Sequence, residues 1–182
     1  MIRSKSDLSR YLAADLARLE KKPTLKDWLL KNERWYIWRY LWTLRHVEYY
    51  YNTSQRLYFL WYFFWYKRMC FDLKVDIKPN NLGPGFCLMH LGSLVRIKQN
   101  CTIGNNCTML PGVVIGNKHF EGDSDERVII GDNCYIGLGT KIFGNVTIGN
   151  NVSIGANTVV TKNIPDNAVV GGIPAKILKI RE

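Results

Sequence analysis

The sequence predicts a mainly β protein, a prism of stacked short strands, preceded by a small α-helical region. Two observations predict this architecture. All 15 glycines lie at or after Gly83, whereas all six tryptophans lie at or before Trp65, so the two parts of the chain differ in kind. In addition, residues 97–116 and 130–165 repeat with a period of six. That period matches neither the alternation of an ordinary strand nor the 3.6-residue turn of a helix.

Apolar residues at helical spacing predict three helices within residues 1–75. The first is expected over residues 8–19, with Ser6 as its N-cap. Thr24 and Asp27 have the spacing of a capping box, so a second helix is expected to begin there and to run to about residue 50. Residues 52–54 interrupt the pattern, and a third helix is expected to end at about residue 70.

The period of six predicts how the second part folds. Each block of six is expected to form one short strand and a corner, and three blocks close one coil. The aliphatic residue that opens a block then points inward and stacks on its equivalent one coil later. Leu82, Leu88 and Leu94 extend the rhythm toward the N-terminus. We expect a prism over residues 76–172, a loop at 117–127 and a tail at 173–182. The opening residues are Ile97, Ile103, Met109, Ile115, Ile130, Ile136, Ile142, Ile148, Ile154 and Val160.

The cysteines follow the same pattern. Cys101, Cys107 and Cys134 occupy the fifth place of a block, where other blocks have Val or Thr, so they are expected to be small core residues. Five scattered cysteines predict reduced thiols and a cytoplasmic protein rather than a disulfide framework. No apolar run approaches the roughly 18 residues of a spanning helix, and no signal peptide is expected at the N-terminus.

The positive charge is concentrated in the helical part. The chain has a formal charge of +10, and residues 1–80 carry 16 Lys and Arg against 8 Asp and Glu. Aromatic residues occupy several faces of the helices expected in the segment 34–67. These helices cannot bury all of them by themselves, so the segment is expected to pack against another surface. Subunit packing is the leading interpretation, and peripheral contact with an anionic inner membrane surface is the alternative. No nucleic-acid reader motif accompanies the charge, so no nucleic acid is expected as a partner.

The blocks of six, the interruption at 117–127 and the ending Gly-Gly-Ile-Pro-Ala-Lys-Ile at 171–177 resemble the left-handed β-helix hexapeptide-repeat acyltransferases. Within them, the chain is most similar to the serine O-acetyltransferase branch, which includes short homologues associated with capsule and exopolysaccharide synthesis. The resemblance implies a left-handed parallel β-helix, a homotrimer with active sites between subunits, and acetyl-CoA as the acyl donor. Pairing of trimers stays open, and no metal is expected.

Acetyl transfer from a thioester to a hydroxyl needs a base with a pKa near neutrality. The chain has three histidines. By resemblance, His90 is the base and Asp76, in Asp-Ile-Lys-Pro, is the carboxylate that orients it. His119 lies in the loop and stays a rival base or an acceptor contact. His46, on an aromatic helix, is expected to be structural. Zinc hydratase chemistry needs three clustered histidines, and the spacing of these three excludes it.

Two positions depart from the serine-acetylating relatives and bear on the acceptor. Met89 stands where that family has an Asp that contacts the amino group of serine, and Arg127 aligns with a histidine that contacts its carboxylate. We therefore expect the acceptor to be a sugar hydroxyl on a polysaccharide precursor. Serine O-acetylation in cysteine biosynthesis is the alternative. A non-catalytic trimeric scaffold or membrane-surface subunit is the second alternative.

The resemblance also implies a donor site. Coenzyme A would lie in a groove between adjacent prisms, in contact with Asn117, Leu138 and Ala156. Leu138 and Ala156 are 18 residues apart, so they should stack on one edge, as a long ligand requires. Gly172 and Lys176 would lie near the other end, with Lys176 available to the nucleotide phosphates.

Overall fold

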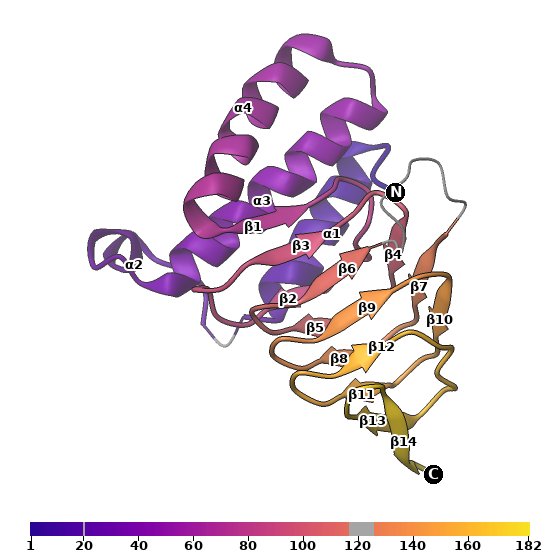
Figure 1. Cartoon of the computed structure of the whole chain (residues 1–182). Coiled ribbons are helices and arrows are strands. Elements are labelled where there is room, and N and C mark those ends of the chain that lie inside the picture. The colour runs from indigo at the N-terminus through magenta and orange to yellow at the C-terminus, as the bar shows by residue number, and fades with distance from the viewer. Residues whose placement is uncertain (20, 117–125) are drawn as a thin grey trace.

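The structure is a computed structural model that describes residues 1–19, 21–116 and 126–182 (Figure 1). Within those residues, four helices precede a column of short strands. The helices are α1 (Lys5–Ala17), α2 (Leu25–Leu29), α3 (Glu33–Asn52) and α4 (Arg56–Leu73).

The described strands form three sheets that face one another across a common core. Neighbouring strands are parallel, except that β13 and β14 are antiparallel. Sheet A contains β1 (Val75–Ile77), β3 (Val95–Ile97), β6 (Val114–Gly116), β9 (Lys141–Phe143) and β12 (Val159–Val160). Sheet B contains β4 (Cys101–Ile103), β7 (Val128–Ile130) and β10 (Val146–Ile148). Sheet C contains β2 (Cys87–Leu88), β5 (Thr108–Met109), β8 (Tyr135–Ile136), β11 (Ser153–Ile154), β13 (Ala168–Gly171) and β14 (Lys176–Ile180).

The period of six is visible in the core. All ten aliphatic residues that open a block are at most 1% exposed, which confirms that they point inward. The register pairs Ile97 with Ile115, and Ile115 with Ile142, so equivalent positions stack from coil to coil. Cys101, Cys107 and Cys134 are buried as well. The expectation for Leu94 was wrong: it is 49% exposed, because the neighbouring Val95 points into the core.

The structure describes four helices where three were expected, and their ends differ from the prediction. α1 begins after Ser4, not Ser6, because Ser4 and Asp7 form the capping box. The capping box of Thr24 and Asp27 is present, but α2 ends at Leu29, and residues 30–32 separate it from α3. Lys31 adopts a φ of 52° in this turn. The turn contains no glycine or proline from which a break in the helix could be predicted. α4 extends to Leu73, three residues beyond the expected end.

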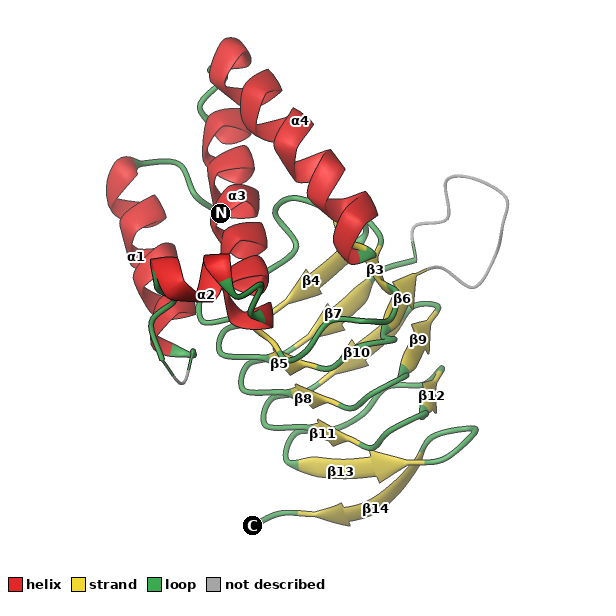
Figure 2. Cartoon of the chain, turned by 90° about the vertical axis from the view of Figure 1, so that its left-hand side faces the viewer, coloured by secondary structure: helices red, strands yellow, loops and turns green. Residues whose placement is uncertain are grey.

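Buried polar contacts join the helices to the first coil. Arg45 of α3 is fully buried and donates hydrogen bonds to the Asp15 carboxylate of α1 and to the carbonyls of Leu82 and Gly83. The Tyr66 hydroxyl of α4 donates to the carbonyl of Ile77 in β1. Figure 2 shows the helices against the upper coils and the β13–β14 hairpin at the opposite end. The helical part and the prism therefore share one core.

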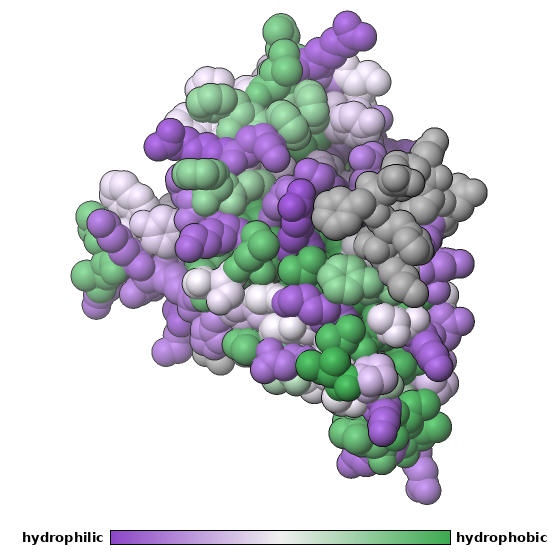
Figure 3. Space-filling model, in the orientation of Figure 1, coloured by the Kyte–Doolittle hydropathy of each residue, from purple (hydrophilic) through white to green (hydrophobic). Residues whose placement is uncertain are grey.

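Besides the exposed apolar side chains of α2 (Leu25, Trp28 and Leu29), two further apolar surfaces face outward in the described chain. One is a stripe on α4 formed by Leu57, Trp61, Phe64 and Phe71, whose spacing places them on one side of the helix. The other is β14, where hydrophobic residues gather at the lower tip of the molecule (Figure 3). Among the described helices, none combines the length and the apolar character needed to cross a membrane.

Candidate active site

The corners that join sheet C to sheet A lie above one another and form one edge of the prism, here called the C–A edge (residues 89–94, 110–113, 137–140 and 155–158). Backbone hydrogen bonds link successive corners: Gly139 N–H donates to the Pro111 carbonyl at 2.9 Å, and Asn157 N–H donates to the Leu138 carbonyl at 2.7 Å. Gly139 has a φ of +72°, and a Cβ there would lie 2.2 Å from Asn157 Oδ1. The edge is therefore narrow and exposes backbone, which suits a long ligand lying along it.

His90 lies at the first corner of the C–A edge, and its side chain is 67% exposed. Its backbone has a φ of +64°, in the left-handed region. In the described part of the prism, the other non-glycine residues with positive φ are all asparagines. Asparagine, aspartate and histidine are the non-glycine residues enriched in this conformation, so His90 fits a corner of the kind that asparagine occupies elsewhere in the prism.

Glu33, the first residue of α3, holds the imidazole. Its Oε2 atom lies 3.1 Å from His90 Nδ1, and its Oε1 atom accepts a hydrogen bond from the backbone N–H of Leu91. When Nδ1 carries the proton and donates it to this carboxylate, Nε2 is left unprotonated as an acceptor. A base oriented in this way is ready to take a proton from a hydroxyl.

The His90–Glu33 pair borders a cavity of about 420 Å³ between the helices and the first coil. Two guanidinium groups also line it. Arg18 donates to Thr108 Oγ1 at 2.8 Å, and the Arg34 guanidinium lies 3.9 Å from the Asp27 carboxylate. The cavity thus combines an imidazole, a carboxylate and two cations, with the exposed Met89 at its rim.

Asp76 lies elsewhere. It is the middle residue of β1, and its side chain projects from the face of sheet A rather than from the C–A edge. Its carboxylate is 3.3 Å from Lys78 Nζ, 3.9 Å from Lys67 Nζ and 4.0 Å from Arg96 Nε. Among the described residues, no hydrogen bond or ion pair joins Asp76 to His90. The carboxylate that does contact His90 is Glu33, which the sequence analysis did not identify.

The structure places the remaining expected site residues at different parts of the prism. Leu138 and Ala156 are exposed on the C–A edge, and Gly172 adjoins it, because its carbonyl accepts from Val159 N–H at 3.2 Å. Lys176 is exposed at the start of β14. Arg127 is exposed just before β7, at the edge between sheets A and B. Asn117 and His119 lie outside the described residues.

His46 is packed in the helical part. Its ring stacks on Tyr62, with 4.9 Å between centroids and 13° between planes, and its Nδ1 lies 2.8 Å from the Trp42 carbonyl. Burial lowers its pKa below the usual value, so it stays neutral at neutral pH. These contacts give it a structural role.

Comparisons with known proteins identify the repeats. Residues 127–162 match the family model "Bacterial transferase hexapeptide (six repeats)", and residues 94–118 match "Hexapeptide repeat of succinyl-transferase". These coils are therefore similar to the hexapeptide repeats of bacterial transferases. Over 106 residues, the chain is 40% identical to a serine acetyltransferase of Staphylococcus aureus and 41% identical to one of Staphylococcus epidermidis. Each match covers 58% of this chain and 49% of the relative, so the chain spans about half the length of the curated relatives it matches.

Solved structures resemble nearly the whole chain. The crystal structure of serine acetyltransferase from Neisseria gonorrhoeae aligns with a TM-score of 0.77 and 29% identity, covering 97% of this chain and 68% of that one. Serine acetyltransferase from Brucella abortus in complex with coenzyme A aligns with a TM-score of 0.78 and 25% identity, covering 98% of this chain and 70% of that one. The fold class is confirmed: a left-handed parallel β-helix preceded by helices.

Proposed function

We propose that the chain is an acetyl-CoA-dependent O-acetyltransferase whose acceptor is L-serine. The observation that carries the proposal is the His90–Glu33 pair at the mouth of a cavity that also contains two arginines. The serine acetyltransferases among its relatives and structural neighbours support the same reaction.

The chemistry follows from the geometry of the pair. His90 Nε2 takes the proton of the acceptor hydroxyl as its oxygen attacks the thioester carbonyl. Glu33 stabilises the imidazolium that forms, and backbone N–H groups stabilise the oxyanion of the tetrahedral intermediate. The intermediate then breaks its carbon–sulfur bond, and the departing thiolate of coenzyme A takes the proton back from His90. The products are the O-acetyl ester and free coenzyme A.

Glu33 also changes the argument about the acceptor. The sequence analysis favoured a sugar because no carboxylate precedes His90, where Met89 stands. The Glu33 carboxylate reaches His90 from α3, with 3.1 Å between Oε2 and Nδ1, so it would also give an ammonium group in the cavity a counter-charge. Arg18 or Arg34 would hold the carboxylate of the amino acid as a bidentate partner. The cavity therefore offers a complementary group for each charge of a zwitterion.

The donor is proposed to lie along the C–A edge, over Leu138, Ala156 and Gly172, with Lys176 near its phosphates. The narrow, glycine-containing corners support this placement, and one of the structural neighbours was solved with coenzyme A. Arg127 lies on a different edge of the same prism from His90. Arg127 would therefore join the His90 site only from a neighbouring subunit, as in the proposed homotrimer.

A sugar hydroxyl on a polysaccharide precursor is the second candidate acceptor. The exposed thioether of Met89 favours it, because an apolar rim beside His90 suits the face of a sugar ring better than an ammonium group. We further propose a cytoplasmic location, with the α4 stripe packed in a subunit contact. A peripheral membrane contact is the rival use of that stripe.

The test is a thiol-release assay with acetyl-CoA and either L-serine or monosaccharides. We expect release with L-serine and a loss of about 100-fold or more in kcat for His90→Asn. Asparagine occupies the equivalent backbone conformation at other corners, so this variant should keep the fold. Release with sugars alone would move the assignment to the second candidate. No acetyl-CoA binding or turnover with either acceptor class would refute the catalytic proposal and favour a scaffold.

A pair of variants decides which carboxylate serves His90. If Glu33 orients the base, Glu33→Gln lowers kcat about tenfold with a changed pH–rate profile, whereas Asp76→Asn does not. The reverse result would restore Asp76 to the role that the sequence analysis gave it. Equal, small effects from both variants would argue that neither carboxylate acts on the base.

A further inference from the structure

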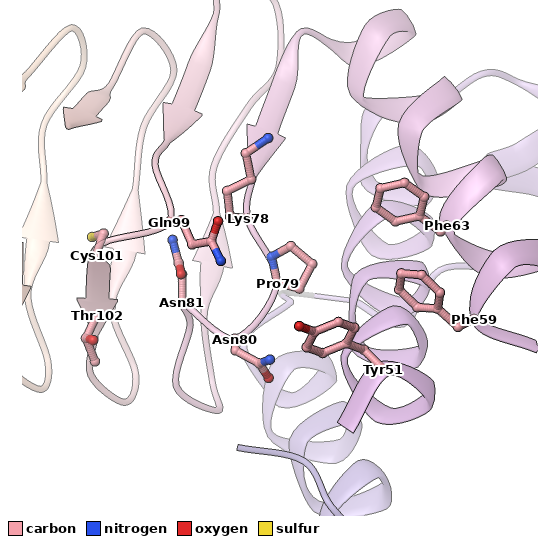
Figure 4. Close-up of a pocket in the computed structure, with 10 residues that line it drawn as sticks. All are labelled: Tyr51, Phe59, Phe63, Lys78, Pro79, Asn80, Asn81, Gln99, Cys101 and Thr102. Atoms are coloured by element: carbon pink, nitrogen blue, oxygen red, sulfur yellow. The ribbon is translucent and has the colours of Figure 1, made fainter. Parts of the chain in front are cut away.

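A second hollow lies between the α3–α4 hairpin and the first two coils, at the edge between sheets A and B (Figure 4). Its volume is about 380 Å³. One wall is aromatic and consists of Tyr51, Phe59 and Phe63. The Phe59 and Phe63 rings stack with 5.2 Å between centroids and 26° between planes, and Tyr51 lies 5.6 Å from Phe59.

The opposite wall is polar and held in place. Gln99 and Thr102 project from the second coil and are exposed. The first coil is fixed to the end of α3, because the side-chain amides of Asn80 and Asn52 exchange hydrogen bonds of 2.8 and 3.0 Å. The Asn81 amide is buried and donates to the Lys98 carbonyl at 2.5 Å. The hollow is therefore formed by the fold itself rather than by a ligand.

Positive charge adjoins one end of this hollow. Lys78 and Gln99 line it and also line a neighbouring depression of about 370 Å³, together with Arg96 and Lys98. Lys78 and Arg96 lie within 4.0 Å of the Asp76 carboxylate, as does Lys67. Among the described residues, Asp76 thus faces three cations and Lys98 adds a fourth beside the depression, so a net positive charge is left at this end of the hollow. Phosphate or carboxylate groups are the partners such a cluster prefers.

We propose that the two connected hollows, here called the A–B groove, bind an anionic sugar. The apolar face of a pyranose ring would pack on Phe59 and Phe63, and its hydroxyls would meet Gln99 and Thr102. Its phosphate or carboxylate would lie between Lys78 and Lys98. Such a ligand matches the groove in three ways. Its flat apolar face fits the aromatic wall, its hydroxyls fit the polar wall, and its negative group fits the cationic end.

Binding in the A–B groove can be tested apart from acetyl transfer. The A–B groove lies at the edge between sheets A and B, whereas His90 of the same chain lies on the C–A edge. Binding can therefore be measured on the full chain without acetyl-CoA. Failure of the serine acetyltransferase proposal would leave this proposal standing, and the reverse also holds.

The experiment is calorimetric titration of the full chain with four probes: α-D-glucose 1-phosphate, D-glucuronate, D-glucose and inorganic phosphate. We expect one of the two anionic sugars to bind with a Kd below about 1 mM, at least about fivefold tighter than glucose or phosphate. The tighter of the two identifies the anionic group. Lys98→Gln and Gln99→Ala should each weaken this binding about fivefold, whereas Lys162→Gln, an exposed lysine outside the groove, should not.

Phe59→Leu separates sugar binding from a general anion patch. This variant keeps an apolar side chain but removes the ring, so it should weaken the sugar anion and leave inorganic phosphate unchanged. Phosphate binding as tight as that of the sugar anions, and insensitive to Phe59→Leu, would overturn the proposal. No binding of any probe would overturn it as well. Circular dichroism checks that each variant is folded.

Discussion

Arg45 offers a sharp test of how the helices are held on the prism. Its side chain is fully buried and donates five hydrogen bonds in the described structure: two to Asp15, one to Glu48, and one each to the carbonyls of Leu82 and Gly83. Arg45→Met keeps much of the volume but leaves two buried carboxylates and two carbonyls without this donor. Breaking a buried ion pair from one side costs about 3–5 kcal/mol.

The unpaired carbonyls add to this loss, while water entry and protonation of Glu48 reduce it. Burial already raises the Glu48 pKa, so that carboxyl can take up a proton more readily. We therefore expect Arg45→Met to lower the free energy of unfolding by about 4 kcal/mol, a large part of the 5–15 kcal/mol typical of a domain.

The assay is urea denaturation followed by tryptophan fluorescence, which reports on the helical part because all six tryptophans lie there. Arg10→Met is the matched control, since the exposed Arg10–Asp7 pair should contribute less than about 1 kcal/mol. A loss below about 1 kcal/mol for Arg45→Met would refute the reasoning, because the carboxylates would then be satisfied without Arg45.

Three further predictions test the coils and the caps. Gly137→Ala should destabilise the prism by a few kcal/mol in urea denaturation followed by circular dichroism, because the new Cβ would lie 2.6 Å from the Ile154 carbonyl oxygen. Burial raises the pKa of Cys101 to about 12, so mass spectrometry should find it unlabelled by iodoacetamide at about pH 8 until the protein unfolds. Hydrogen bonds from Asn32 and Thr24 lower the pKa of Asp27 to about 2. Its contribution to stability is therefore present above about pH 4 and is lost as the pH falls toward 2, and Asp27→Asn should flatten thermal unfolding across that range.

The fold could be predicted because its cause is repeated along the chain. Each opening aliphatic residue, such as Ile97 or Ile142, faces the same core for the same reason. The strands can therefore be predicted from the sequence without knowing which distant residues contact one another. The exposed position of His90 follows from its offset within a block. The errors fell where the repeat or a local signal is absent: Leu94 lies at the slip before Ile97, and Lys31 turns the chain without a glycine.

The partner of His90 could not be predicted in the same way. Glu33 is 57 residues away in sequence and reaches His90 only because α3 packs on the first coil. A glutamate at the start of a helix is common, since it complements the helix dipole, so nothing in the sequence distinguishes it. Asp76 lies in the motif Asp-Ile-Lys-Pro, but β1 directs its side chain to the outer face of sheet A rather than to the C–A edge.

The two ends of the column are covered by different elements. A stack of parallel strands would present unpaired backbone at its first and last coil, ready to join another column. At one end, Arg45 of α3 donates hydrogen bonds to two carbonyls of the first coil. At the other end, β14 turns back and pairs antiparallel with β13. A chain that lost either element would expose more unpaired strand backbone, which favours association of one column with another.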